Sequence, residues 1–199
     1  MNEALEAKLR SVAESTVKRI FWDWDGVLGL KRFWYKSVRS DKTLKAFVEK
    51  LFSDSERTKE WMRGRVSLTK LIEMYKAPYS YDELSKLLIS DWSNEAINVS
   101  LFSAVRVMYP NVNHYIVTDN MTIFNNFVHQ SRFIQDNFER VFNSSDYGSL
   151  KDDEISLFDY VLDNLKLESF HGSLLFDDSP ASCKRFEQLG GRAIVMERI

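Results

Sequence analysis

Acidic residues follow three of the short apolar runs in this 199-residue sequence. The runs at 20–22, 115–117 and 174–176 have the apolar composition of buried strands. In a parallel α/β sheet the residues that follow the strands share one edge, and ligands bind there. The polar residues that we expect at this edge are Asp23, Asp25, Thr118, Asp119, Asp177 and Asp178.

Carboxylates gathered in this way need a positive partner, because burying each unpaired ion costs on the order of several kcal/mol. The candidate ligands are oxygen donors with no cluster of His or Cys, which favours Mg²⁺ and argues against Zn²⁺ or copper. A magnesium ion held by few protein oxygens keeps positions for water and a phosphate. The sequence therefore predicts an edge that binds magnesium together with a phosphate group.

Two further residues suit a phosphate. Thr118 offers a hydroxyl and is expected where a helix begins, so that main-chain N–H groups also face the anion. Lys151 follows the short run at 141–142 and precedes a helix predicted around Ile155, and it supplies a mobile positive charge. We expect the Lys151 ammonium to balance both the phosphate and the aspartates.

The elements that position these residues alternate between strands and helices, as in an α/β domain with a largely parallel sheet. A fifth strand is predicted at 193–196, and Ile155, Phe158, Leu162 and Leu165 share the spacing of one helical face. Between 30 and 98 helical patterns dominate, with a capping box at Ser80 and Glu83. A helical insertion of about 70 residues therefore follows the first strand.

Four motifs, in order, resemble those of the haloacid dehalogenase superfamily. They are DWDGVL at 23–28, VTDN at 117–120, Lys151 within YGSLKDDEISLFDYVL, and LLFDDSP at 174–180. The resemblance covers nearly the whole chain. It implies a Rossmann-like three-layer α/β core with a parallel sheet, formed by 1–29 and 99–199, and a small helical cap at 30–98. This cap is similar to that of the subfamily with sugar phosphatases and β-phosphoglucomutase.

The resemblance also implies the chemistry of a two-step phosphoryl transfer. Asp23 would be the nucleophile that becomes an aspartyl phosphate, and Asp25 would protonate the leaving oxygen and then activate water. Thr118 and Lys151 would hold the phosphoryl oxygens, and Asp119 would also belong to the substrate-binding residues. Mg²⁺ would be held by Asp23, the main-chain carbonyl of Asp25 and Asp178, with Asp177 as a ligand or acting through water. An acid at position 25 separates this chain from the dehalogenases of the family.

Each motif also has a simpler explanation when it stands alone. Asp25 and Gly26 could form an ordinary turn, Thr118 or Asp177 could cap a helix, and Lys151 could be a solvated cation. Their order after successive predicted strands favours catalysis. Three functions stay open: a phosphatase of small metabolites, with sugar phosphates favoured; a phosphomutase of the β-phosphoglucomutase type; and a non-catalytic binding protein that keeps the fold.

The predicted cap offers two candidate contacts to substrate. Arg63 and Arg65 flank Gly64 in a basic turn between helices, where a second phosphate or sugar contact is possible and simple surface solvation is the alternative. The aromatic residues at 33–35 could line the substrate site, although packing at the cap hinge is favoured. Cys183 has no motif partner and is expected to pack as a small core residue.

The amino-acid composition limits the kinds of molecule that we expect this protein to bind. With 27 Lys plus Arg against 29 Asp plus Glu, the net charge of −2 gives no reason to expect nucleic acid or an anionic membrane. The apolar runs are far shorter than the about 20 residues needed to span a bilayer. One cysteine favours a reducing compartment, so we expect a cytoplasmic monomer or homodimer that acts on a small phosphorylated substrate. Residues 1–16 are expected to form a short surface helix.

Overall fold

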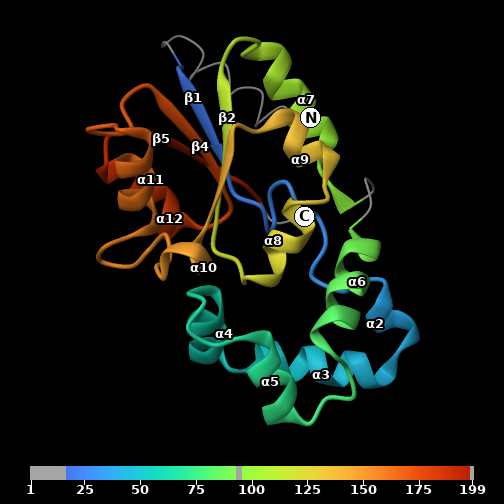
Figure 1. Ribbon diagram of the computed structural model, residues 1–199. Coiled ribbons are helices and arrows are strands. Elements are labelled where there is room, and N and C mark those ends of the chain that lie inside the picture. Colours follow the sequence, from blue (N-terminus) through green and yellow to red (C-terminus); the bar gives the residue numbers. More distant parts are fainter. Residues whose placement is uncertain (1–16, 93–95, 198–199) are drawn as a thin grey trace.

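The computed structural model describes residues 17–92 and 96–197, so the expected N-terminal helix lies outside the described residues. Within these ranges five strands form one parallel sheet in the order β3-β2-β1-β4-β5 (Figure 1). The strands are β1 (Arg19–Trp22), β2 (Asn113–Thr118), β3 (Arg140–Asn143), β4 (Ser173–Asp177) and β5 (Arg192–Val195). All five match runs predicted from the sequence, with ends that differ by one or two residues.

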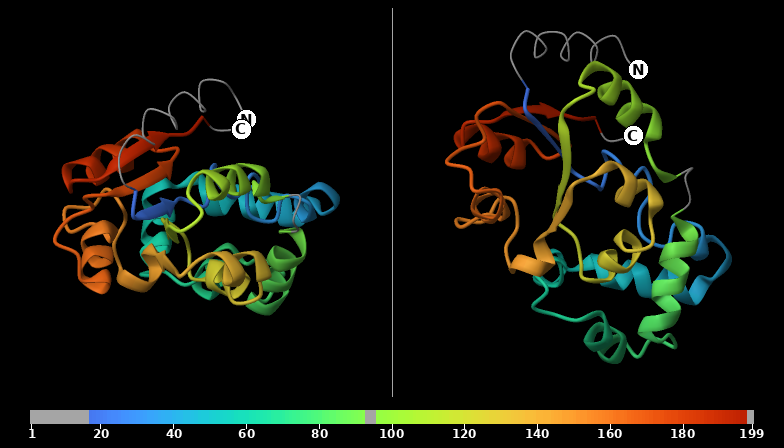
Figure 2. Two further views of the ribbon diagram at one scale, coloured as in Figure 1. Left: turned by 90° about the horizontal axis from the view of Figure 1, so that it is seen from above. Right: turned by 45° about the horizontal axis from the view of Figure 1, so that its top comes forward.

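Helices cover both faces of the sheet and make three layers, as Figure 2 shows. One face packs on α7 (Val99–Met108), α8 (Ile123–Val128) and α9 (Arg132–Asn137). The other packs on α11 (Leu157–Leu165) and α12 (Pro180–Gln188), and α10 (Ser144–Tyr147) follows β3 directly. In β1, Trp22 faces the first layer and Phe21 the second, because successive strand residues point to opposite faces. The three-layer α/β prediction is confirmed.

Helix α11 starts later than the sequence suggested. Ser156 and Asp159 form a capping box, so the helix begins at Leu157. Ile155 lies before the cap and is 67% exposed, whereas Phe158 and Leu162 are buried. The prediction that Ile155 belongs to the apolar face of this helix was therefore wrong, because the cap at Ser156 starts the helix after that residue.

Five helices lie between β1 and α7, and we call them the inserted helices. They are α2 (Ser37–Ser40), α3 (Lys42–Ser53), α4 (Ser55–Met62), α5 (Leu68–Tyr75) and α6 (Tyr81–Asp91), with no strand among the described residues of this stretch. The predicted capping box at Ser80 and Glu83 starts α6. Figure 1 places these helices beyond the carboxyl ends of the strands.

The two connections to the inserted helices run side by side. The Leu30 amide donates to Ala96 O at 2.8 Å, and the Asn98 amide donates to Leu28 O at 2.7 Å. Phe33 and Trp34 are buried here and pack at near-perpendicular ring angles, so these aromatic side chains fill the core at the root of the insertion. Within the described ranges, none of the helices has both the length and the hydropathy that a membrane span requires.

Candidate active site

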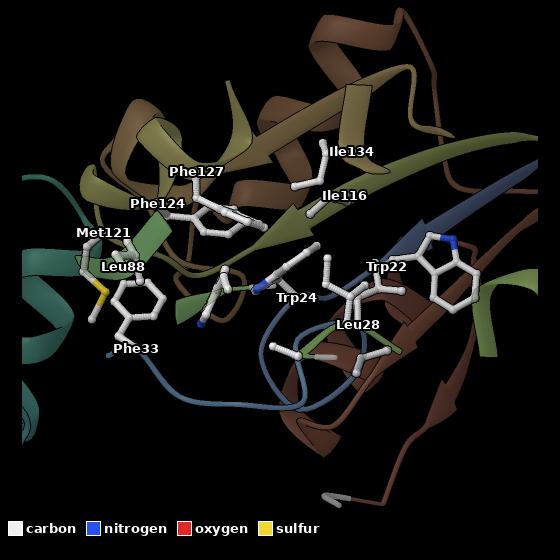
Figure 3. Close-up of a cluster of buried hydrophobic side chains, with 14 of the residues drawn as sticks. Trp22, Trp24, Leu28, Phe33, Leu88, Ile116, Met121, Phe124, Phe127 and Ile134 are labelled. Atoms are coloured by element: carbon white, nitrogen blue, oxygen red, sulfur yellow. The ribbon is translucent and has the colours of Figure 1, made fainter. Parts of the chain in front are cut away.

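Asp23 lies immediately after the central strand and is held by main-chain contacts on both sides. Its amide donates to Phe176 O at 2.8 Å, and its Oδ1 accepts from the Trp24 amide at 2.7 Å. The Trp24 ring is buried and packs against Trp92 and Phe127, with ring centroids 5.2 and 5.4 Å apart. Figure 3 shows Trp24 beside Phe127 within this apolar cluster. Packing of this indole therefore fixes the main chain from which Asp23 and Asp25 project.

Lys151 lies between two of the aspartates. Its Nζ is 3.0 Å from Asp23 Oδ1 and 2.6 Å from Asp177 Oδ2, and the residue is 2% exposed. Burial by itself lowers the pKa of this ammonium, but the Asp177, Asp23 and Asp119 carboxylates outweigh burial and raise it well above its usual value. The expectation of a mobile cation is thus wrong, because two buried carboxylates hold the ammonium in place.

Burial changes the acidity of the neighbouring carboxyl groups. It raises the pKa of Asp23 well above its usual value, with repulsion from Asp177 and Asp25 adding to the effect and attraction to Lys151 opposing it. Burial likewise raises the pKa of Asp119 to about 6, although Lys151 again opposes. Extra positive charge beside Asp23 would therefore favour its carboxylate form.

Three carboxylates converge where the sequence predicted a metal. One oxygen from each of Asp23, Asp177 and Asp178 lies within 4.8 Å of the other two. The Ser179 amide donates to Asp177 Oδ1 at 2.8 Å and so orients that side chain. A donor set made only of oxygens, with buried negative charge in excess of the single ammonium, fits Mg²⁺. The Asp25 side chain is outside this group of three carboxylates. The expected contact between its main-chain carbonyl and the metal stays a prediction.

Thr118 ends β2 and Asp119 follows it, at the same edge of the sheet. Thr118 is fully buried and ends the strand, while α8 begins only at Ile123. The expected helix start at Thr118 is therefore wrong, since a turn of several residues separates the two elements. Asp119 Oδ1 accepts from the Lys151 amide at 3.0 Å. This contact holds the Lys151 loop against β2, and a substrate contact of Asp119 stays a prediction.

The turn that carries Arg63 and Arg65 contacts the core beside α10. Arg63 forms a two-point ion pair with Asp153, through Nε at 2.9 Å and through Nη2, and also contacts Glu60. Arg65 is more exposed and donates to Gly148 O at 3.3 Å. Both guanidinium groups thus have protein partners, and their contact with substrate stays a prediction.

Main-chain groups approach closely at the same contact. The Ser144 hydroxyl donates to Met62 O at 2.7 Å. Gly64 has φ of +69°, and a Cβ added there would lie 2.5 Å from Ser145 O. Glycine is needed for the turn and for the approach. The inserted helices also reach the core through α6, where Asn126 Nδ2 donates to Tyr81 OH and Ser85 Oγ at 2.9 and 2.8 Å.

Sequence reasoning missed three residues that connect this site. Asn120 contacts Asp25 and Thr118, Ser144 contacts Met62 O, and Asp153 contacts Arg63. Asn120 stands inside a quoted motif, so its position was the one available signal. Nothing in the local pattern pairs Asp153 with Arg63, because the contact joins distant parts of the chain. His114, expected to be structural, is buried and accepts from Trp22 Nε1 through Nδ1.

Comparison with solved structures identifies the fold. A HAD-like family hydrolase from Porphyromonas gingivalis is 18% identical with a TM-score of 0.69, over 92% of this chain and 93% of that one. A HAD family enzyme from Bacteroides thetaiotaomicron, in its magnesium complex, is 18% identical with a TM-score of 0.68, over 92% and 95%. A HAD phosphatase from Thermococcus onnurineus is 16% identical with a TM-score of 0.62, over 92% and 87%.

The Bacteroides enzyme has also been crystallised with magnesium and inorganic phosphate. No protein-family model and no curated protein matches the chain at the level of sequence. The structural likeness nevertheless extends over nearly the whole of both partners, the inserted helices included. The chain therefore has the fold of the HAD-like hydrolases, the haloacid dehalogenase superfamily that its four motifs resemble.

Proposed function

We propose that this protein is a magnesium-dependent phosphatase of the haloacid dehalogenase superfamily that hydrolyses a small phosphorylated metabolite, with a sugar phosphate favoured. One observation carries the proposal: Asp23, Lys151, Asp177 and Asp178 meet at the carboxyl edge of the sheet, with the lysine ammonium between two aspartates. Neighbours of the same fold bind magnesium and phosphate, which supports the assignment.

The position of the inserted helices supports a small substrate. They touch the core at two places, where Met62 O accepts from Ser144 and where Tyr81 and Ser85 accept from Asn126. Asp23 is buried at 6% exposure, which favours a small ester over a protein or a nucleic acid as substrate. A compact ester fits, and enclosure would keep bulk water from the first chemical step.

The residues divide the reaction between them. A carboxylate oxygen of Asp23 attacks phosphorus and forms a new P–O bond, while the bond to the leaving oxygen breaks and Asp25 gives that oxygen a proton. Water then attacks the aspartyl phosphate, its proton goes to Asp25, and the Asp23 carboxylate is restored. Thr118 and Lys151 hold phosphoryl oxygens throughout. Magnesium, held by Asp23, Asp177 and Asp178, would supply positive charge to the phosphoryl group.

The test compares wild type with Asp23→Asn on a panel of sugar phosphates and other small phosphate esters with magnesium. We expect wild type to release free phosphate and Asp23→Asn to retain less than about 1% of that activity, because an amide is a poor nucleophile. Borohydride added during turnover should convert residue 23 of wild type to homoserine by reducing the acyl phosphate.

The matched control is Asp136→Asn, which changes an exposed aspartate in α9 in the same way. It should keep wild-type activity, which would show that the loss in Asp23→Asn is specific to position 23, and that loss would itself exclude a contaminating phosphatase. Activity in Asp23→Asn above a few per cent would remove Asp23 from the nucleophile role. Isomerised ester in place of free phosphate would indicate a phosphomutase.

A further inference from the structure

Asn120 occupies a position between the proposed proton donor and the proposed phosphate ligand. Its Nδ2 donates to Asp25 Oδ2 at 2.8 Å and to Thr118 Oγ1 at 3.1 Å. The residue is fully buried. The side-chain amide therefore has both of its N–H groups committed, one to each of these two side chains.

The contacts define which way the amide points. While Asp25 is a carboxylate, the reverse orientation would place the amide oxygen against it, so that two acceptors would face each other. In the orientation observed, Oδ1 is buried and has no hydrogen-bond partner among the described residues. This orientation directs both N–H groups of the amide to Asp25 and Thr118.

The turn itself does not need this side chain. The Asn120 amide N–H donates to Ser144 Oγ at 2.9 Å, and the one hydrogen of that hydroxyl, which Met62 O accepts at 2.7 Å, is shared with the Asn120 carbonyl at 3.2 Å. These two main-chain contacts anchor the turn after β2 to α10 whatever side chain stands at position 120. The amide group is therefore available for a role in the site.

We propose that Asn120 is a positioning residue that aims the Asp25 carboxyl group at the leaving oxygen and directs the Thr118 hydroxyl toward the phosphoryl group. The contact to Oδ2 fixes the orientation of the Asp25 carboxyl group, which gives and later takes the proton. Thr118 has one hydroxyl hydrogen and accepts from Asn120, so that hydrogen points away from Asn120 and can be donated to a phosphoryl oxygen. This inference rests on the proposed phosphatase function.

The test uses the leaving group as its readout. Asn120→Ala should lower kcat/KM for an alkyl phosphate by about 100-fold, the scale of general acid catalysis. For p-nitrophenyl phosphate the loss should stay within about tenfold, because its leaving group needs little protonation and only the Thr118 contribution remains. A residue that serves only the fold would lower both values equally.

A double variant separates action through Asp25 from a direct effect. In an Asp25→Asn background, adding Asn120→Ala should lower kcat/KM for the alkyl phosphate by at most about tenfold more, since the acid is already gone and only the Thr118 contribution remains. The matched control is Asn125→Ala in α8, whose amide contacts Asn143 and Asp146 and neither Asp25 nor Thr118. It should keep the ratio of the two substrates at the wild-type value.

The outcomes distinguish the two proposals. Equal losses for both substrates, or full additivity with Asp25→Asn, would overturn the role of Asn120 while wild-type phosphate release leaves the phosphatase assignment standing. Absence of phosphate release by wild type from every ester would overturn both. If Asn120→Ala fails to fold, Asn120→Ser is the second variant, because serine keeps one donor at a shorter reach. It should also lower kcat/KM more for the alkyl phosphate than for p-nitrophenyl phosphate, with a smaller difference between the two substrates.

Discussion

The ion pair between Arg63 and Asp153 is expected to hold the inserted helices against the core. It makes two hydrogen bonds, and the side chains of Arg63 and Asp153 are 14% and 24% exposed. The Arg63 guanidinium lowers the pKa of Asp153, so the pair stays charged at neutral pH. Asp153 also accepts from the Leu150 amide at 2.8 Å, which links the contact to the loop that carries Lys151.

The magnitude follows from this geometry. A partly buried, two-point, charge-assisted pair contributes about 1–2 kcal/mol once solvent screening is allowed for. If that free energy favours the closed arrangement, its loss reduces the ratio of closed to open protein by roughly 5- to 30-fold. We therefore expect Asp153→Asn and Arg63→Ala each to lower kcat/KM for an alkyl phosphate by up to that factor, because activity follows the closed fraction.

Comparing the two variants shows whether Arg63 acts by holding the inserted helices against the core, which we call the latch role, or by contacting the substrate. Asp153→Asn leaves Arg63 in place, so it should be harmless if Arg63 binds substrate and harmful if Arg63 acts by holding the helices. The double variant should be no worse than either single one. Arg65→Ala is the control in the same turn and should change kcat/KM by less than threefold, because Arg65 is 58% exposed.

Small-angle scattering gives an independent measurement of the same equilibrium. Both single variants should have a larger radius of gyration than wild type, and high salt should move wild type in the same direction because it screens the pair. Wild-type kcat/KM in Asp153→Asn, with a loss in Arg63→Ala alone, would refute the latch and return Arg63 to the substrate-binding role that the sequence suggested.

Two further predictions concern stability. Saturating Mg²⁺ should raise Tm by about 5–10 °C, because binding at 100 times Kd adds about 2.7 kcal/mol to the unfolding free energy of a chain of this size. Asp178→Asn should abolish most of that rise. An equal Tm in Mg²⁺ and in EDTA would exclude the metal site. Burial lowers the pKa of His114 to about 4 from 6.5, with Arg106 adding to the effect. Because the unfolded chain then takes up the proton first, unfolding free energy should fall by on the order of 2–3 kcal/mol from pH 6.5 to pH 4. In His114→Gln, which keeps an acceptor for Trp22, denaturant titrations over this range should show a smaller fall, and an unchanged slope would contradict the assignment.

The sheet and the edge that carries the site could be predicted because each depends on a short local pattern. Strand β4 is an apolar run that ends in Asp177, and β1 ends just before Asp23, so the position of both aspartates followed once the runs were identified as parallel strands. The expected magnesium site was predicted in the same way, from the positions of aspartates directly after the strands. Its three side chains do lie within reach of one ion.

What the sequence could not predict depends on contacts between distant segments. The partner of Arg63 is Asp153, and no periodicity relates the two positions. Lys151 was expected to be mobile because a lysine is usually solvated, and only the meeting of Asp23 and Asp177 around it explains its burial. Asn120 has the composition of an ordinary turn residue, and the direction of its amide becomes meaningful only beside Asp25.

The central place of β1 has a consequence for the order in which the molecule forms. In β1, Trp22 pairs with Ile116 of β2 on one side and with Phe176 of β4 on the other. Both neighbours come much later in the chain, so β1 leaves the ribosome long before either of them. The inserted helices follow it at once and join residues close in sequence, and such local contacts form fastest. A nascent chain should therefore carry folded helices above an unfinished sheet. Asp177 and Asp178 arrive last, so the growing chain can capture neither metal nor metabolite until β4 has been made.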